Sequence, residues 1–466
     1  MSKLSQDCLI IIFEELEYDV KSLYSCLLIN KLWCETVVPV LWKNPWKFLK
    51  NNKYKILIRL SYLHRTITSF LPPEIKLHLI NKDINTHKPL FKYISYLKTL
   101  KDTSIVAIAQ NTHDKNKFIR ELFKMIFNYS PNIKKLIIFS NYFDQELCNI
   151  PESRKCFLNV TTLKCYTFVK LDKLAQICHN IRYLNIKYCN YDNNPGLITL
   201  IKAQKNLKYF KCGFKAFSDP YEISCKGIGE ALTKQADSIL LIHLSCPIKF
   251  CCPIFTKFVN LKTLKIDGKI VDKSLMKPNL PNLEYLELYG GYIYEAAIFI
   301  KSTKGNLREI RIKHDFHEKN RLMFIQSITE YCPNLKSVAL FYQDDHLVIR
   351  ELEKLFSTCS QLERLVIVCE DYYNDSYDKL LDILVINAPS SLNSLKLDNF
   401  KIKMKSLKTF FKRWKEKHQT SISVYYILYF KEIHKVDIIN DCIEVKKFDD
   451  NYCCRYFDWN YDYWCY

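Results

Sequence analysis

The segment Asn282-Leu283-Glu284-Tyr285-Leu286-Glu287-Leu288 decides the fold of this chain. After Leu283 the apolar and polar side chains alternate, which predicts a β-strand with Leu286 and Leu288 on its buried face. Close variants of this segment recur along most of the sequence at intervals of roughly 20 to 30 residues, as in a repeat protein. The first apolar residues of the copies are Ile133, Val160, Ile181, Leu207, Ile239, Leu261, Leu283, Leu307, Leu335, Leu362 and Leu392.

Between the copies lie stretches with helical periodicity, such as Leu171–Cys178 and Leu322–Cys332. A Pro-Asn pair often follows such a stretch and ends it, because proline has no amide donor and excludes the helical conformation for the residue before it. Each unit is therefore helix, break and strand, and neighbouring units must stack to bury their apolar faces.

Over about residues 115–400 the sequence resembles the leucine-rich-repeat family, in its longer helix-containing subtype. The resemblance implies an α/β fold: a horseshoe-shaped solenoid with a parallel sheet on its concave side and helices on its convex side. Outward residues of its strands would then bind the target. These are Tyr183, Asn185, Lys187, Tyr209, Lys211, Lys265, Tyr285, Glu287 and Tyr289, a set of tyrosines and lysines that favours an acidic partner.

The first forty-odd residues follow a different pattern, with helical spacing in three short stretches. The first contains Ile12-Phe13-x-x-Leu16, the second runs from Val20 to Leu28, and the third contains Trp33 and ends with Leu41-Trp42. A segment of about forty residues is too short to form an independent core, so part of its apolar surface is expected to contact something else.

This ordered set resembles the F-box motif, with Ser5 where the family usually has proline. The combined resemblance is to F-box/leucine-rich-repeat proteins, which implies a substrate receptor of a Skp–cullin–F-box ubiquitin ligase. The partners implied are the Skp adaptor, the cullin bound through it, and an unknown protein target. The residues that would contact the adaptor are Leu4, Leu9, Ile12, Phe13, Leu16, Leu23, Leu27 and Trp33.

Four segments are expected from these patterns. They are an F-box-like helical module at 1–48, a linker with an N-terminal cap or degenerate repeats at 49–115, the solenoid at 116–420, and a C-terminal cap with an aromatic tail at 421–466.

Composition limits the other classes of function. The net charge is +20, but the lysines are dispersed, so specific nucleic-acid binding is not expected. The 20 cysteines include no C-x-x-C pair and no secretory leader precedes them, which favours reduced thiols in the cytoplasm or nucleus, without disulfides or bound metal. No catalytic motif, cofactor motif or membrane-spanning segment is recognised, so the chain is expected not to be an enzyme.

One alternative stays open at the level of sequence. The chain could be a leucine-rich-repeat scaffold outside any ligase, or a basic protein associated with nucleic acid, with the F-box-like segment acting only as a cap. The exposure of Ile12, Phe13 and Trp33 separates the two readings, since a cap would bury them against the first repeats. The identity of the target, and whether it is phosphorylated or held through a small molecule, are left open.

Overall fold

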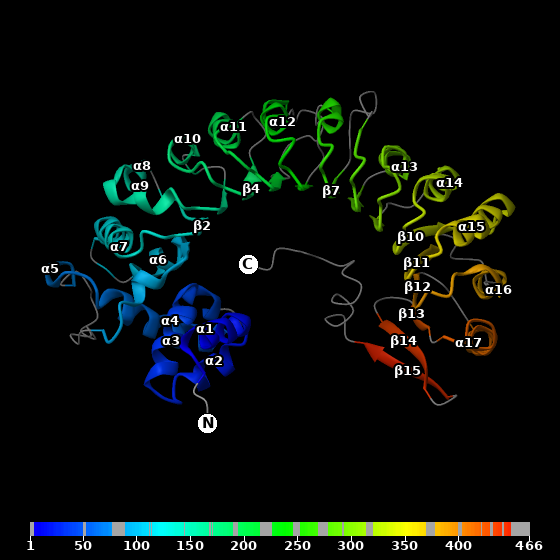
Figure 1. Ribbon diagram of the computed structural model, residues 1–466, viewed down its shortest axis with the longest axis horizontal. Helices are drawn as coiled ribbons and strands as arrows, with labels where there is room; N and C mark the ends of the chain where they lie inside the picture. The colour runs from blue at the N-terminus through cyan, green and yellow to red at the C-terminus, as the bar shows by residue number, and fades with distance from the viewer. Residues whose placement is uncertain are drawn as a thin grey trace. The chain divides into compact units, whose positions relative to one another are not determined.

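A computed structural model of the chain describes residues 4–448, except 50–52, 77–88, 111, 113, 144, 167–168, 170, 190–193, 215–225, 246–251, 269–277, 291–292, 314–319, 370–377, 399–402, 421, 429–431 and 440–441. The aromatic tail expected at the C-terminus lies outside these residues. The chain divides into two compact units, Met1–Lys215 and Ala216–Tyr466, within the run of repeats. In both units, helices and strands alternate along the repeats (Figure 1).

Unit 1 begins with the three helices expected from the sequence, α1 (Gln6–Glu15), α2 (Val20–Cys26) and α3 (Lys31–Trp42). A polar side chain caps the start of each one, as free amides at a helix N-terminus require. Ser5 accepts from the Cys8 amide at 3.3 Å, Asp19 caps α2, and Asn30 caps α3. Ser5 therefore retains a structural role at the start of α1.

The remainder of unit 1 alternates helices with short strands. The strands β1 (Thr99–Lys101), β2 (Lys135–Ile138), β3 (Thr162–Tyr166), β4 (Tyr183–Cys189) and β5 (Tyr209–Phe214) pair in parallel, in chain order. Helices α7–α11 lie along one side of this sheet (Figure 1). The helical elements after α3 are η2 (Pro45–Leu49), α4 (Lys53–Thr68), α5 (Pro73–Lys76), η3 (Tyr93–Tyr96), α6 (Asp102–Ile108), α7 (Lys115–Tyr129), α8 (Gln145–Asn149), α9 (Pro151–Phe157), α10 (Leu171–Ala175) and α11 (Pro195–Lys202).

Unit 2 continues the same alternation. Its strands are β6 (Leu241–Ser245), β7 (Thr263–Asp267), β8 (Tyr285–Tyr289), β9 (Glu309–Lys313), β10 (Ser337–Tyr342), β11 (Arg364–Cys369), β12 (Ser394–Asp398), β13 (Ser423–Leu428), β14 (Glu432–Ile439) and β15 (Cys442–Phe448). Strands β6–β13 pair in parallel, whereas β14 and β15 are antiparallel. Its helical elements are α12 (Lys226–Thr233), η4 (Cys252–Thr256), α13 (Ile293–Lys301), α14 (Arg321–Tyr331), α15 (His346–Thr358), α16 (Asp378–Asn387) and α17 (Met404–His418).

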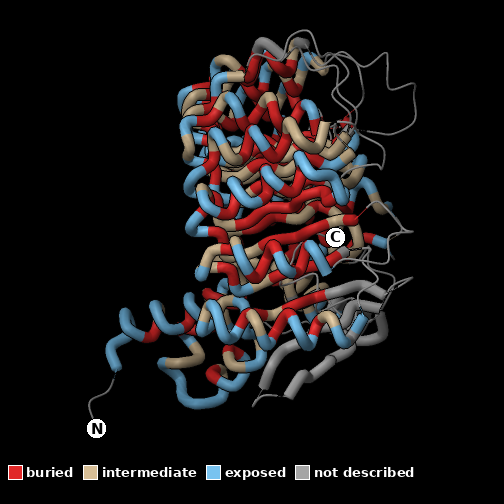
Figure 2. The backbone as a smooth tube through the Cα atoms, turned by 90° about the vertical axis from the view of Figure 1, so that its right-hand side faces the viewer, coloured by how far each residue is buried: buried red, intermediate tan, exposed pale blue. Residues whose placement is uncertain are grey.

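The core of both units lies between the strands and the helices, where buried segments recur along the backbone (Figure 2). All the leading apolar residues of the predicted repeats, from Ile133 to Leu392, are fully buried. Cys332 and Cys359 are buried as well, and the Cys359 thiol contacts the Cys332 carbonyl at 3.3 Å. The fold is therefore the leucine-rich-repeat α/β fold that the sequence predicts, with parallel strands on one side and helices on the other.

The asparagine of the repeat has a structural role. The side-chain amides of Asn260, Asn282 and Asn306 each donate to a backbone carbonyl of the preceding repeat, at 3.0, 3.0 and 2.8 Å. Asn180 and Asn334 make the equivalent bond. This asparagine ladder fixes the spacing between neighbouring repeats.

Candidate protein-interaction surfaces

The N-terminal helices form a small core of their own. Leu9, Phe13 and Leu23 are buried with Val37 and Leu41, and the Trp33 ring packs edge-on against Phe13 with 5.3 Å between centroids. The expectation that Leu9, Phe13 and Leu23 contact an adaptor directly is thereby corrected. Their spacing places them on the inner stripe of their helices, where they hold the module together.

Other expected contact residues stay accessible. Leu4 and Ile12 are exposed, with Ile12 at 42%, while Leu16, Leu27 and Trp33 are half-buried at the edge of the core. The module also exposes apolar residues that the sequence interpretation missed. These are Ile11, Tyr24, Leu28, Ile29 and Leu32, with Leu28 at 88%. Helical spacing could have identified Ile11, because it lies on the opposite side of α1 from Leu9 and Phe13.

The module is joined to the first repeat by main-chain and side-chain hydrogen bonds. The Trp46 indole donates to the Thr99 carbonyl at 2.8 Å, and the amides of Lys98 and Thr99 both donate to the Lys43 carbonyl at 2.9 and 3.0 Å. The ring of Trp42 packs on Tyr93, 4.7 Å between centroids. These bonds fix the orientation of the helical module on the sheet of unit 1.

The outward residues of β4 and β5 lie together on the open side of the sheet in unit 1. Register pairs Tyr183 with Tyr209 and Asn185 with Lys211, and the two tyrosine rings are 6.1 Å apart. The ammonium group of Lys164, on β3, lies 5.6 Å from the Tyr183 ring. Lys187 and Lys211 are half-buried and Tyr209 is exposed, as expected of an outward position.

Asn185 departs from the expectation because it is only 6% exposed. It lies in the row between Lys164 and Lys211, whose longer side chains flank it on both sides. Its Oδ1 atom has no hydrogen-bond partner among the described residues. Asn185 therefore lies on the open side of the sheet as a buried acceptor, and not as an exposed side chain.

The predicted target residues of unit 2 bind one another. Lys265 forms an ion pair with Glu287 at 2.9 Å, and the Tyr285 hydroxyl donates to Glu287 at 2.6 Å. Lys265 and Arg311 both lie over the Tyr285 ring, at 4.9 and 5.3 Å from its centroid. Burial, followed by the charge of Glu287, raises the pKa of Tyr285 far above its usual value, so the phenol stays protonated. Tyr289 remains exposed beside this cluster.

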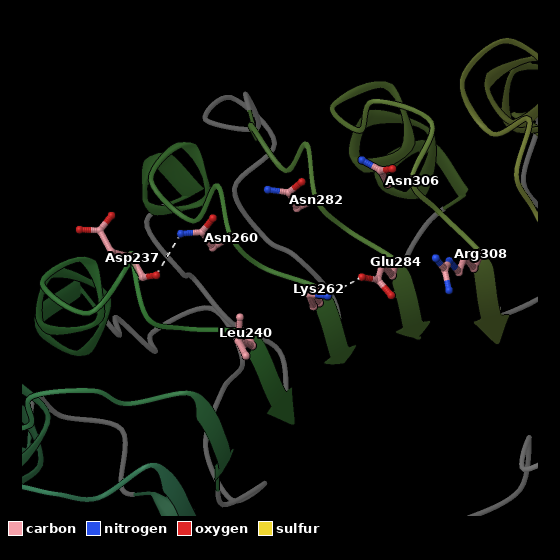
Figure 3. Close-up of a pocket in the computed structure, with 8 residues that line it drawn as sticks. All are labelled: Asp237, Leu240, Asn260, Lys262, Asn282, Glu284, Asn306 and Arg308. Carbon is pink, nitrogen blue, oxygen red and sulfur yellow. Dashed lines mark hydrogen bonds and ion pairs between the residues drawn. The ribbon is translucent and has the colours of Figure 1, made fainter.

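A shallow depression lies at the edge of the unit 2 sheet, where the strands begin (Figure 3). Lys262 and Glu284 form an ion pair across it at 2.8 Å, and Asn260 is held by its bond to the Asp237 carbonyl. Its lining residues are Asp237, Leu240, Asn260, Lys262, Asn282, Glu284, Asn306 and Arg308. The polar groups here serve the asparagine ladder and the ion pair, so the depression offers little for a ligand to bind.

The described residues provide neither a metal site nor a membrane-spanning helix. No group of three or more His, Cys, Asp or Glu in the described part of the chain is arranged to hold a metal ion. Among the described helices, none combines the length and the apolar character needed to cross a membrane.

Comparison with known proteins gives matches to solved structures only. No protein-family model matches the chain, and no curated protein matches it. A chain of the yeast Rad7–Elc1 complex is 13% identical, with 85% of this chain and 93% of that chain covered and a TM-score of 0.37. The leucine-rich-repeat protein LegL7 from Legionella pneumophila is 14% identical (65% and 87% covered, TM-score 0.29). The circular leucine-rich-repeat protein CroV588 is 11% identical (59% and 41% covered, TM-score 0.29).

Proposed function

We propose that this chain is the substrate-recognition subunit of a Skp–cullin–F-box ubiquitin ligase. In this proposal the N-terminal helices bind the Skp adaptor, and through it the cullin, while the repeats bind the target protein. The chain supplies no catalytic group and needs no cofactor. Its contribution is to raise the effective concentration of the target near the ubiquitin-carrying subunits.

The observation that carries the proposal is the exposed apolar surface of the helical module. Ile11, Ile12, Leu28, Ile29 and Leu32 are all exposed, although the module has a closed core beneath them. Isolated exposed apolar residues are ordinary, but a concentration of them on so small a segment is typical of a surface that binds another protein.

The junction between module and repeats supports the same reading. A ligase receptor has to hold its target in a defined position relative to the adaptor, because ubiquitin transfer depends on positioning. The bonds of Trp46 and Lys43 to the first repeat would supply that rigidity in unit 1.

The adaptor site is tested by changing the exposed residues and leaving the core intact. In an Ile12→Asp and Leu28→Asp double variant, each aspartate would have to be buried at the interface, with a loss of about 2 kcal/mol or more per site. We expect co-purification with the Skp adaptor to be abolished, with an unchanged circular dichroism spectrum.

A matched control replaces two exposed leucines of the repeats by aspartate: Leu158, which directly follows α9, and Leu347, on α15. This control should bind the adaptor like the wild type. Wild-type protein that does not bind the adaptor, or a double variant that binds it undiminished, would contradict the proposal. A scaffold outside any ligase, or a protein bound to nucleic acid, would then be the better candidate.

A further inference from the structure

Helix α17 differs in charge from the other α-helices described in unit 2. It contains six lysine or arginine residues and one glutamate, whereas each of α12–α16 has equal numbers of acidic and basic residues or one acidic residue more. It follows α16 as the last described helix and lies beside it (Figure 1). Positive charge is therefore concentrated on a single helix of this unit.

Four lysines of α17 form one row on its solvent side. Helical geometry places them within about 80° of one another around the axis and along about 15 Å of its length. They are Lys405, Lys408, Lys412 and Lys415, and all are exposed. The opposite side of the helix is buried in the core through Leu407, Phe410, Phe411 and Trp414. We call the four lysines the lysine row.

The lysine row is separate from the contacts that hold α17 in the array. Arg413 forms an ion pair with Asp382 of α16. The ammonium groups of Lys405, Lys408 and Lys412 have no hydrogen-bond or ion-pair partner among the described residues. At least three positive charges of the row are therefore available to a ligand.

The charges of the lysine row do not serve the stability of α17. A positive charge is favourable near the C-terminus of a helix and unfavourable near its N-terminus. Lys405 lies in the first turn, where the described sequence has no acidic residue and no side chain caps the helix. Lys408 lies three residues after Lys405 and four before Lys412, so these like charges repel one another. A charge pattern that opposes the stability of its own helix favours a binding role.

The composition of the solvent side narrows the class of partner. Besides lysines it exposes Thr409 and Glu416, and none of the described apolar or aromatic side chains of α17 is exposed. Protein interfaces depend on apolar or aromatic anchors and are depleted in lysine. Single-stranded nucleic acid requires rings on which its bases stack. The row matches neither of these partners and fits a polyanion that is recognised by charge alone.

The position of α17 favours a flat polyanion over a nucleic-acid duplex. The major groove of DNA is about 12 Å wide and admits a single helix. Because α17 packs against α16, it does not stand apart from the array as such a helix must. A membrane surface is flat, so lipid headgroups reach every ammonium group of a straight row at once. The apolar side of α17 is buried, which leaves electrostatic contact without insertion of the helix.

From these observations we infer that the lysine row binds the surface of a membrane that contains anionic phospholipids. The ammonium groups of the row pair with the negatively charged headgroups, and each lysine near such a surface raises the affinity about fivefold. The inference does not rest on the proposed function. If both hold, the receptor captures its targets at a membrane surface.

The test measures binding of the full-length chain to vesicles by sedimentation. One set of vesicles contains one-third phosphatidylserine in phosphatidylcholine, and the other contains phosphatidylcholine alone. The chain should bind the first set and not the second. The binding should disappear at about 1 M salt, where charges are screened beyond about 3 Å. Failure of the wild type to bind the anionic vesicles would overturn the inference.

The decisive variant combines Lys405→Glu, Lys408→Glu and Lys412→Glu. It should bind the anionic vesicles about a hundredfold or more weakly, because three attractive charges become repulsive. Its circular dichroism spectrum should be unchanged. If this variant does not fold, the corresponding glutamine variant should lose vesicle binding in the same direction.

A matched control reverses three other exposed lysines of unit 2 and has the same net charge. These are Lys257, Lys301 and Lys304, which lie outside α17. The control should bind the anionic vesicles within about twofold of the wild type, because its substitutions leave the lysine row intact. Equal losses in the two variants would show that net charge alone attracts the chain to the vesicles, and the inference would be wrong.

Two further measurements separate this inference from other readings. A DNA duplex is the alternative probe: if the wild type binds the duplex more tightly than the vesicles, and the α17 variant loses duplex binding, the row belongs to a nucleic-acid site and the inference is overturned. The α17 variant should still co-purify with the Skp adaptor, and the Ile12→Asp and Leu28→Asp variant should still bind the vesicles. Loss of adaptor binding in the wild type would therefore remove the ligase role without affecting the membrane site.

Discussion

At the scale of single residues, helical spacing shows which side chains share a face but not what covers that face. Leu9 and Phe13 lie on one stripe of α1, Leu16 continues the spacing directly after it, and the sequence interpretation assigned that stripe to a partner. The structure uses it for the core of the module, which leaves Ile11 and Ile12 outside. The sequence identified the apolar residues correctly. Which of them face the core and which face outward depends on the positions of α2 and α3, which the spacing within α1 does not give.

Asp102 is a second residue whose role could not be read from the sequence. Its buried carboxylate accepts from the amides of Phe139 and Ser140 at 2.9 and 2.7 Å, and from the Ser140 hydroxyl at 2.7 Å. These partners are 37 and 38 residues further along the chain. Only the parallel pairing of β1 with β2 brings them together.

We predict that Asp102→Ala destabilises unit 1 by about 2–3 kcal/mol, because buried donors lose a charged acceptor. The midpoint of urea denaturation, followed by circular dichroism, measures the loss. Asp102→Asn keeps one acceptor oxygen and should lose less than Asp102→Ala. An alanine variant with the wild-type midpoint would show that the carboxylate is not needed to join the first two repeats.

At the scale of elements, the strands were predictable because each carries its own alternation. Even the degenerate copies beginning at Val160 and Ile239 form the strands β3 and β6. The ion pairs between strands could not be predicted, since they depend on which side chains the register brings together. Lys262 and Glu284 are 22 residues apart in sequence and yet lie 2.8 Å from each other.

The asparagine ladder gives a prediction at this scale. Asn306→Ala removes the 2.8 Å bond to the Pro281 carbonyl and should cost about 0.5–1.5 kcal/mol, the usual contribution of one hydrogen bond. Asn393→Ala is the control, because the bond of that amide to the Ser391 carbonyl lies within its own repeat and is long, at 3.5 Å. The midpoint of urea denaturation should be lower for Asn306→Ala than for Asn393→Ala. Equal midpoints would show that the ladder does not stabilise the fold.

At the scale of the whole molecule, the net charge of +20 concealed an uneven distribution. The sequence interpretation placed Tyr183 and Tyr285 in one binding surface, because both occupy the same position of the repeat. In the structure Tyr285 is enclosed by Glu287, Lys265 and Arg311, whereas Tyr183 belongs to a sheet whose strands carry only basic charges. Composition alone could not separate these environments, because charge compensation depends on neighbours across the sheet.

The reactivity of the cysteine thiols reports how tightly the repeats are packed. Cys156, Cys178 and Cys359 are buried and form no disulfide bond, whereas Cys8 is exposed. Burial raises the pKa of each of these three thiols to about 12. At pH 8 only about one in ten thousand of such groups is a thiolate, the form that reacts with a disulfide reagent.

We therefore predict two phases when the native protein reacts with such a reagent at pH 8. Exposed thiols such as Cys8 should react at once, and the buried thiols only as fast as the repeats open. After denaturation without reductant, close to all 20 cysteines should react. A large shortfall would reveal disulfides, and prompt reaction of Cys156, Cys178 and Cys359 in the native protein, located by mass spectrometry, would show that the repeats are not closed around them.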